Sequence, residues 1–293
     1  GLVAMTKKYL PCALFLLLLP SFLLADLRVM TLNTEWLWTP FDKRVDGSKL
    51  IRQDMSEADY LNEIRFYAGL VKDNGVDILA VSEIENEFVA KDLARAIGKN
   101  WQAYFRQGRD TATGQDVAIL SHLNAVEDSI TTFGFPCAKA PKARKKKCLS
   151  KVLGVHLYDP SAGGRTIAVL TAHFLSKRNN SKVKTLKRES QALALVKSIR
   201  RSENSFGKEA DIQLIALGDF NDTIHSNTLK LLSKGAGLTN SLSCSSISNK
   251  KSNKKGNMAR IDHILFKGFS CHDDVAISSG KFSDHKAIMA VLK

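Results

Sequence analysis

The chain alternates short, continuous apolar runs with segments in which apolar residues recur every three or four positions. The runs predict buried strands, and the recurring pattern predicts helices that pack on a sheet. Three helices are expected: one that follows a cap at Ser56 and ends at Asn74-Gly75, and two more over 87–97 and 183–201. Strands are expected over 27–32, 76–82, 102–106, 117–120, 152–158, 166–172, 212–217, 261–266, 275–277 and 287–292. This excess of strands predicts two sheets with helices outside them.

Several apolar runs stop at a residue that can hold a metal or move a proton. Four runs end at Asn33, at Glu83, at His173, and at Asp219 with Asn221, while Asp284-His285 opens the last apolar stretch. Because buried strands deliver side chains to one rim of a sheet, we expect these residues to converge. The pattern predicts a divalent-cation site with a general base.

These residue types suit the hydrolysis of a phosphodiester. That reaction requires charge neutralisation at the phosphoryl oxygens, an activated water and a stabilised leaving group. Magnesium prefers a few oxygen ligands, which Glu83, together with Asn33 and Asp219 or Asp284, would supply. His285 is the candidate base, and Asp262, from the strand that follows Arg260, is the candidate carboxylate that orients it.

The first 25 residues have the layout of a secretory signal peptide. Two lysines precede an apolar segment, 9–24, that prolines interrupt and Ala25 closes. A membrane anchor is the competing interpretation, but the run is short for a span and is broken by those prolines. We therefore expect cleavage after Ala25, one domain over 26–293, a secreted, extracellular or periplasmic location, and no stable membrane association of the mature chain.

The charge of the chain favours polyanionic or anionic-lipid partners. The full sequence of 293 residues carries a net charge of +14, and residues 26–293 have 41 basic against 29 acidic side chains, or +12. Basic residues gather in three loops, 139–147, 177–188 and 250–255. A single such loop can be a solvated connection, but together they indicate phosphate contact. Lys177 and Arg178, four and five residues after His173, are the candidate phosphate contacts.

Four cysteines remain after the predicted cleavage, an even number in an oxidising compartment. Three pairings are possible. We expect Cys137–Cys148 and Cys244–Cys271, because each pair closes a local loop. Free thiols or a zinc site are the alternative, although the chain has no Cys-x-x-Cys spacing.

Six short motifs, in order along the chain, resemble those of the endonuclease/exonuclease/phosphatase superfamily and its secreted DNase I-like nucleases. They are Thr31-Leu32-Asn33, Ser82-Glu83, Ala172-His173-Phe174, Gly218-Asp219-Phe220-Asn221, Arg260-Ile261-Asp262 and Ser283-Asp284-His285. The resemblance extends over residues 26–293. It implies an α/β (α+β) fold, a four-layer sandwich of two mixed β-sheets flanked by helices, with the site at one end.

The resemblance also implies roles for the site residues. Glu83 would be the principal ligand of Mg²⁺, with Mn²⁺ or Ca²⁺ as alternatives, and Asn33 and Asp284 would support it. The catalytic set would have Asp219 and Asn221 orienting the nucleophile and the phosphate, Asp262 with His285 as the base, and His173 at the leaving oxygen.

Two positions depart from the family pattern. The family usually has Gln before the metal-binding Glu, where this chain has Ser82, so a hydrogen bond near the metal would be made differently. The carboxylate that supports the second histidine has no clear counterpart. Asp116 is the nearest candidate, with an ordinary solvated strand-start residue as an equal alternative.

Secretion, charge and the basic loops favour a monomeric nuclease that cuts DNA with little sequence preference, because lysines contact the backbone and not the base edges. RNA stays open as a substrate. The alternatives are a sphingomyelinase-type phospholipase C, another phosphodiesterase of the same superfamily, and a non-catalytic protein that binds DNA or an anionic surface.

Overall fold

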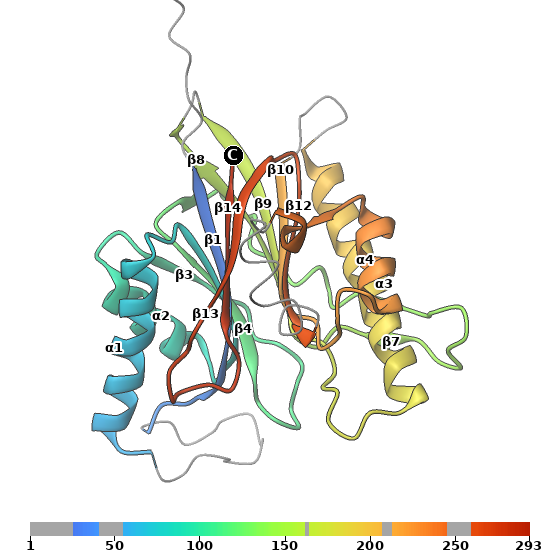
Figure 1. Ribbon diagram of the computed structural model, residues 1–293, viewed down its shortest axis with the longest axis horizontal. Helices are drawn as coiled ribbons and strands as arrows, with labels where there is room; N and C mark the ends of the chain where they lie inside the picture. The colour runs from blue at the N-terminus through green and yellow to red at the C-terminus, as the bar shows by residue number, and fades with distance from the viewer. Residues whose placement is uncertain (1–25, 41–54, 162–163, 207–212, 245–258) are drawn as a thin grey trace, which may run out of the picture.

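The computed structural model describes residues 26–40, 55–161, 164–206, 213–244 and 259–293 (Figure 1). Two six-stranded sheets stack face to face, and helices cover the outer face of each. The predicted signal peptide, 1–25, and the basic loop 250–255 lie outside the described residues.

The first sheet is mixed, because β1 pairs parallel with β2 while its other neighbours pair antiparallel. Its order is β13 (Cys271–Ile277), β14 (Ala287–Leu292), β1 (Leu27–Leu37), β2 (Ile78–Ile84), β4 (Asp116–Ser121), β3 (Gln102–Tyr104). Side chains of β1 alternate between two apolar layers: Met30 and Leu32 face the helices, whereas Leu27 and Val29 face the second sheet.

The second sheet is also mixed, with β9 and β10 as its parallel pair. Its order is β11 (Thr239–Asn240), β12 (Asp262–Lys267), β10 (Gln213–Asp219), β9 (Arg165–Ala172), β8 (Val152–Asp159), β5 (Asn124–Ala125). A separate two-stranded hairpin joins β6 (Cys137–Ala138) to β7 (Lys147–Cys148).

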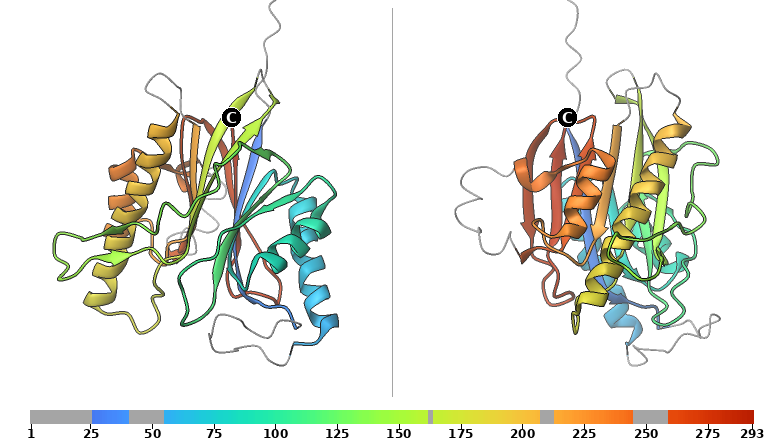
Figure 2. Two further views of the ribbon diagram at one scale, coloured as in Figure 1. Left: turned by 180° about the vertical axis from the view of Figure 1, so that it is seen from behind. Right: turned by 90° about the vertical axis from the view of Figure 1, so that its right-hand side faces the viewer.

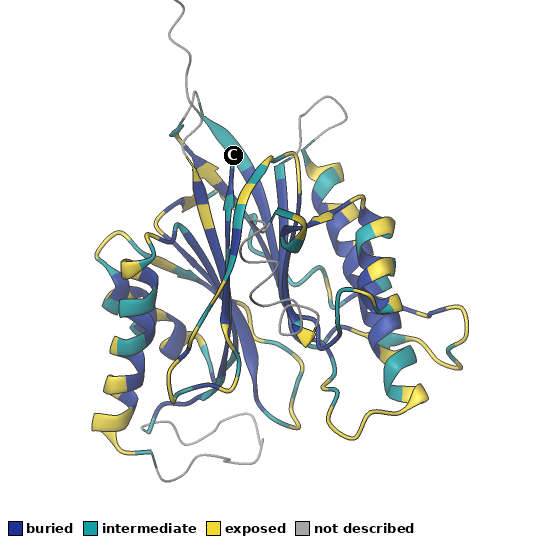
Figure 3. Cartoon of the chain, in the orientation of Figure 1, coloured by how far each residue is buried: buried dark blue, intermediate teal, exposed yellow. Residues whose placement is uncertain are grey.

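Helices cover the outer face of each sheet (Figure 2). α1 (Glu57–Asp73) and α2 (Glu87–Ile97) pack on the first sheet, and α3 (Lys182–Ser205) and α4 (Asn227–Ala236) on the second, with a short 3₁₀ turn, η2 (Ser241–Cys244), near β11. The central strands are buried on both faces, whereas the edge strand β13 and the outer sides of the helices are exposed in part (Figure 3). This arrangement confirms the predicted four-layer sandwich. None of the helices in the described ranges is long and apolar enough to cross a membrane.

Most predicted elements are present, and some were missed. α1 begins after Ser56, whose side chain accepts a hydrogen bond from the Asp59 amide as predicted. Both predicted disulfides, Cys137–Cys148 and Cys244–Cys271, are formed. The pattern did not predict α4 or the short strands β5, β6, β7 and β11, and the strand expected over 102–106 ends at Tyr104.

Candidate active site

The predicted site residues meet where the two sheets face each other, at the lower edge in Figure 1, where β1, β2, β9 and β10 end. Asn33 of β1 joins the sheets. Its Nδ2 donates to Oε1 of Glu83 at 2.9 Å and to Oδ2 of Asp219 at 3.1 Å. On the second sheet, Asp219 and Asp262 are direct partners across β10 and β12. The convergence expected from the strand ends is therefore present.

Unusual backbone conformations direct these side chains. Glu83 has φ of 63° and lies where the pairing of β2 shifts register, and Asn221 has φ of 51°. Such left-handed conformations cost about 1–3 kcal/mol for residues other than glycine, and they concentrate at functional sites. Gly218 has φ of 146°, and a Cβ there would lie 2.3 Å from the carbonyl oxygen of Ala172. Only glycine fits before Asp219.

Three side chains form a group that suits a metal ion. Nε2 of His173 lies 3.7 Å from Oε1 of Glu83 and 3.5 Å from Oδ2 of Asp219. Burial raises the pKa of Glu83, and burial together with the charge of Asp262 raises the pKa of Asp219 to about 8. Buried carboxylates that resist ionisation gain from a nearby cation, so these residues fit a divalent metal.

The other predicted metal ligands lie around this group in different ways. Asn33 turns its amide nitrogen toward the carboxylates, while its Oδ1 accepts a hydrogen bond from the Glu35 amide at 2.9 Å. The Asp284 side chain is 76% exposed, and Oδ1 lies 3.7 Å from Nε2 of His285. Asp284 therefore stands at the mouth of the site.

Gln115 was not predicted from the sequence. Its Nε2 donates to Oε2 of Glu83 at 2.7 Å, and its Oε1 accepts from Nζ of Lys151 at 3.3 Å. Lys151 in turn pairs with Asp110 at 3.1 Å. The position before Glu83 is Ser82, and the glutamine amide that contacts the Glu83 carboxylate comes instead from Gln115, just before the neighbouring strand β4. The one available signal was that Gln115 lies two positions before the apolar run 117–120.

His285 and Asp262 form the predicted couple. Nδ1 of His285 lies 2.6 Å from Oδ2 of Asp262, so the carboxylate fixes the ring and leaves Nε2 for the site. Burial disfavours the charged ring, but the hydrogen bond and charge of Asp262, with the charges of Asp219 and Asp284, raise the pKa of His285 to about 10. Ser283 anchors the segment by donating to the Asn33 carbonyl at 2.8 Å.

His173 is buried and neutral. Burial, followed by the positive charges of Lys151 and His285, lowers its pKa well below the ordinary value. Within the described residues no partner reaches its Nδ1. Asp116, the candidate support, accepts instead from the Gly108 amide at 2.8 Å and from the Gln107 side chain at 2.5 Å.

The remaining predicted residues divide between the site and the scaffold behind it. Asn221 ties two loops together, since its Nδ2 donates to the Phe174 carbonyl and its Oδ1 accepts from the Lys177 amide. The ammonium of Lys177 pairs with Asp222 at 2.9 Å. Arg178, in contrast, lines the cleft above the metal group.

The cleft has a volume of about 680 Å³ and opens over Glu83, His173 and His285. Four basic side chains line it: Lys147, Lys151, Arg178 and Lys184. The acids at its floor suit a cation, and the cations at its wall suit a phosphate. The site can therefore hold a phosphoester next to a metal and a histidine base.

The fold and this site define a hydrolase of phosphoesters, and the comparisons agree. The sequence profile of the Endonuclease/Exonuclease/phosphatase family matches residues 30–285. The chain belongs to this family, whose members hydrolyse phosphoester bonds and generally depend on a divalent metal. No curated protein sequence matches the chain.

Solved structures share the fold at low sequence identity. An endonuclease/exonuclease/phosphatase from Bacteroides vulgatus is 16% identical, with a TM-score of 0.58 over 92% of this chain and 99% of that one. The human nocturnin catalytic domain is 13% identical, with a TM-score of 0.58 over 92% and 94%. A mannosyl-6-phosphatase from Bacteroides thetaiotaomicron is 15% identical, with a TM-score of 0.54 over 91% and 99%. At these identities the likeness concerns the fold alone.

Proposed function

We propose that the protein is a secreted, Mg²⁺-dependent nuclease that hydrolyses DNA phosphodiester bonds with little sequence preference. The observation that carries the proposal is the cleft itself, in which a carboxylate–histidine group lies below a wall of lysine and arginine. A small monoester needs few cations, whereas a nucleic-acid backbone presents a row of phosphates.

The residues of the metal group and the couple take separate parts in this reaction. Glu83 and Asp219, the two carboxylates of this group, would hold the cation, which would supply positive charge against the scissile phosphate and against the carboxylates that keep the pKa of His285 high. Asp262 orients His285, so that Nε2 accepts the proton of the attacking water.

The cleft wall binds and orients the substrate. Arg178 and Lys184 reach the cleft from the loop before α3 and from its first turn, and Lys151 reaches it from the start of β8. Lysine and arginine contact phosphate oxygens without reading base edges, so cleavage has little dependence on sequence. The buried, neutral His173 faces the reaction centre and can assist the departure of the leaving oxygen.

The test is cleavage of supercoiled plasmid by purified residues 26–293, with Mg²⁺ or with EDTA. We expect cutting only with the metal, and a decrease in kcat of about 10²- to 10⁴-fold in His285→Gln. His122→Gln is the matched control, because His122 pairs with Asp77 at the opposite end of β2. Intact plasmid with Mg²⁺, Mn²⁺ and Ca²⁺ alike, or full activity of His285→Gln, would overturn the proposal.

The same preparation separates the alternatives. A sphingomyelinase-type enzyme would release phosphocholine from vesicles and leave DNA intact, and a sugar phosphatase would release inorganic phosphate from a monoester. Comparison of single-stranded DNA, duplex DNA and RNA would establish the preferred nucleic acid. Secretion is tested separately, by fusing residues 1–25 to a reporter and measuring its export.

A further inference from the structure

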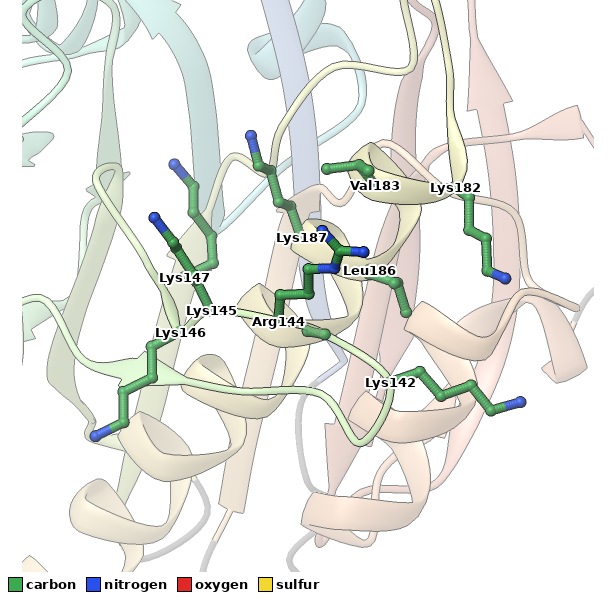
Figure 4. Close-up of a pocket in the computed structure, with 10 residues that line it drawn as sticks. Lys142, Arg144, Lys145, Lys146, Lys147, Lys182, Val183, Leu186 and Lys187 are labelled. Atoms are coloured by element: carbon green, nitrogen blue, oxygen red, sulfur yellow. The ribbon is translucent and has the colours of Figure 1, made fainter.

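A second basic cavity lies beside the active-site cleft, between the β6–β7 hairpin loop and the first turns of α3 (Figure 4). We call it the hairpin pocket. Its volume is about 650 Å³, and apart from Ala143, Val183 and Leu186 every residue that lines it is a cation. The seven cations are Lys142, Arg144, Lys145, Lys146, Lys147, Lys182 and Lys187.

The cations of the hairpin pocket are not neutralised from within the protein. Among the ion pairs of the described residues, none joins a carboxylate to any of the seven cations. Lys151 pairs with Asp110, and both Lys177 and Arg188 pair with Asp222. Other exposed cations also lack an acidic partner, but the hairpin pocket brings seven such cations together around one cavity.

The position of the pocket on α3 adds to the positive potential. The first turn of α3 contains no acidic residue, although the amino end of a helix favours negative charge. Lys182, Lys184 and Lys187 occupy the first two turns instead. Like charges at the positive end of a helix dipole are unfavourable in the free protein, and a bound anion removes that penalty.

The scaffold holds the cations together in spite of their repulsion. The Cys137–Cys148 disulfide closes the base of the hairpin. The Ala140 amide donates to Oγ of Ser190 at 3.0 Å, and Nζ of Lys197 donates to the Cys137 carbonyl at 2.8 Å, so two bonds fasten the hairpin to α3. A loop that served only as a solvated connection would not need this fixation.

The hairpin pocket adjoins the active-site cleft. Lys147 lines both cavities, and Lys184, which lines the cleft, lies one helical turn before Lys187, which lines the pocket. A polyanion whose phosphate occupies the cleft therefore meets the pocket as its chain extends past Lys147. Several cations spread over two elements match several successive phosphates and exceed what a single phosphate requires.

We propose that the hairpin pocket is a second binding site, which holds the sugar–phosphate backbone of DNA several nucleotides away from the scissile bond. This inference rests on the proposed nuclease function and extends it. The pocket makes the enzyme prefer long substrates, because only these reach both the cleft and the pocket, and it makes binding depend steeply on salt.

The test is a quadruple variant, Lys142→Gln, Lys145→Gln, Lys146→Gln and Lys187→Gln, whose positions line the pocket and not the cleft. Binding of a fluorescein-labelled 30-base-pair duplex is measured in EDTA between 50 and 200 mM NaCl. We expect Kd at 50 mM to rise at least about tenfold and the slope of log Kd against log salt to fall by about 2 to 4, as loss of that many phosphate contacts predicts.

The matched control neutralises four exposed cations on the opposite outer layer, Arg65, Lys72, Lys91 and Lys99, in the same way. It keeps the same net charge as the quadruple variant, so a general charge effect would weaken both equally. In the presence of Mg²⁺, kcat/KM on bis(p-nitrophenyl) phosphate, which is too small to reach the pocket, should stay within about twofold of wild type in both variants.

The outcomes separate the two proposals. Equal Kd and salt slope in the quadruple variant and the control overturn the hairpin pocket as a DNA site, and leave the nuclease function intact if plasmid is still cut. If the quadruple variant loses binding to phosphatidylglycerol vesicles but still binds DNA like wild type, the hairpin pocket is a membrane-binding surface and the proposed DNA site is overturned. A wild-type protein that binds DNA through the pocket and cuts none overturns the nuclease function alone.

Discussion

The Glu83 carboxylate is held from several directions by side chains that come from different strands. Asn33 donates to Oε1, Gln115 donates to Oε2, and His173 stands 3.7 Å from Oε1. Contacts of this kind orient a metal ligand and tune its affinity. Protein side chains therefore orient the Glu83 carboxylate, which lies in a backbone conformation that a residue other than glycine rarely adopts.

Loss of the Gln115 amide should weaken metal binding. In Gln115→Ala we expect the Mg²⁺ concentration for half-maximal activity to rise about 10- to 100-fold, because Oε2 of Glu83 loses its donor. Activity at saturating Mg²⁺ should fall far less. The measurement is a metal titration of plasmid cleavage. The control is Gln102→Ala, because the Gln102 side-chain amide donates to Asn124, away from the site. An unchanged titration curve for Gln115→Ala would count against this role.

A buried histidine outside the site predicts how stability depends on pH. Burial, with the nearby Arg260, lowers the pKa of His263 to about 3. Its Nε2 lies 2.8 Å from the Asp222 carbonyl, and its Nδ1 faces the Asn240 amide. Between pH 6.5 and 3 the unfolded chain therefore takes up a proton at His263 that the folded protein does not, so stability falls as the pH falls, by about 1.4 kcal/mol per unit.

His263→Gln should flatten this dependence. We expect the difference in unfolding free energy between pH 7.5 and 4.5 to shrink by about 2–3 kcal/mol, although the variant is less stable at neutral pH. Urea unfolding at both values measures it. His122 contributes to stability with the opposite pH dependence. Its hydrogen bond to Asp77 raises the pKa of His122, so its contribution to stability is present below pH 6.5 and is lost as the pH rises, and His122→Gln should remove that contribution. A His263→Gln profile parallel to wild type would refute the argument.

At the scale of elements, α4 supports the loop that follows β10. Thr228 in its first turn donates a hydrogen bond to Oδ2 of Asp222 at 2.8 Å. Asp222 also forms ion pairs with Lys177 and Arg188. The loop carries Asn221, one of the predicted site residues. A short helix on the outside of the sandwich therefore helps to fix a residue at its rim.

Removal of the α4 cap should destabilise the protein measurably. Oγ of Ser226 accepts from the Leu229 amide at 3.2 Å. In Ser226→Ala we expect a loss of about 1 kcal/mol in the free energy of unfolding, because a helix-end amide loses its partner. Ser233→Ala, within the same helix, should change the free energy of unfolding by less than about 0.5 kcal/mol, because alanine favours helices. Equal urea midpoints for the two variants would disprove the assignment.

The sequence predicted those elements whose pattern is strong and local. The buried strands are continuous apolar runs, so the residues at their ends could be expected to converge, and Asn33, Glu83, His173 and Asp219 do so. α4 was missed, although Ser226 and Gly237 mark its ends. Its length is not the reason, because the 11-residue α2 was predicted; Gly235 inside α4 weakens the helical signal.

Contacts between distant segments could not be predicted in the same way. Gln115 lies 32 positions from Glu83, and the hydrogen bond exists only because β4 pairs beside β2 with a register shift at that point. Lys177 and Arg178 are neighbours in sequence, yet one pairs with Asp222 and the other lines the cleft. The backbone conformation of the loop before α3 decides which of these two side chains faces the cleft, and sequence spacing does not predict that conformation.

For the whole molecule, the site is a joint between the two halves of the sandwich. Glu83 belongs to the first sheet and Asp219 to the second, and Asn33 bridges them. Two carboxylates with raised pKa values at this joint oppose close approach of the sheets when both are ionised. A cation held by these carboxylates would replace that repulsion with attraction, so the proposed metal binding would be coupled to the stability of the fold.

The coupling predicts that Mg²⁺ raises the melting temperature even when no substrate is present. Binding at about 100 times Kd adds about 2.7 kcal/mol to the folded state. For a domain of this size that corresponds to an increase in Tm of about 5–10 °C over the EDTA form. Glu83→Gln should abolish the increase, whereas Glu87→Gln, an exposed acid at the start of α2, should retain it. Thermal unfolding in MgCl₂ is compared with NaCl of equal ionic strength. An equal rise in all three proteins would mean that the cation binds elsewhere, and the joint between the sheets would then not be the metal site.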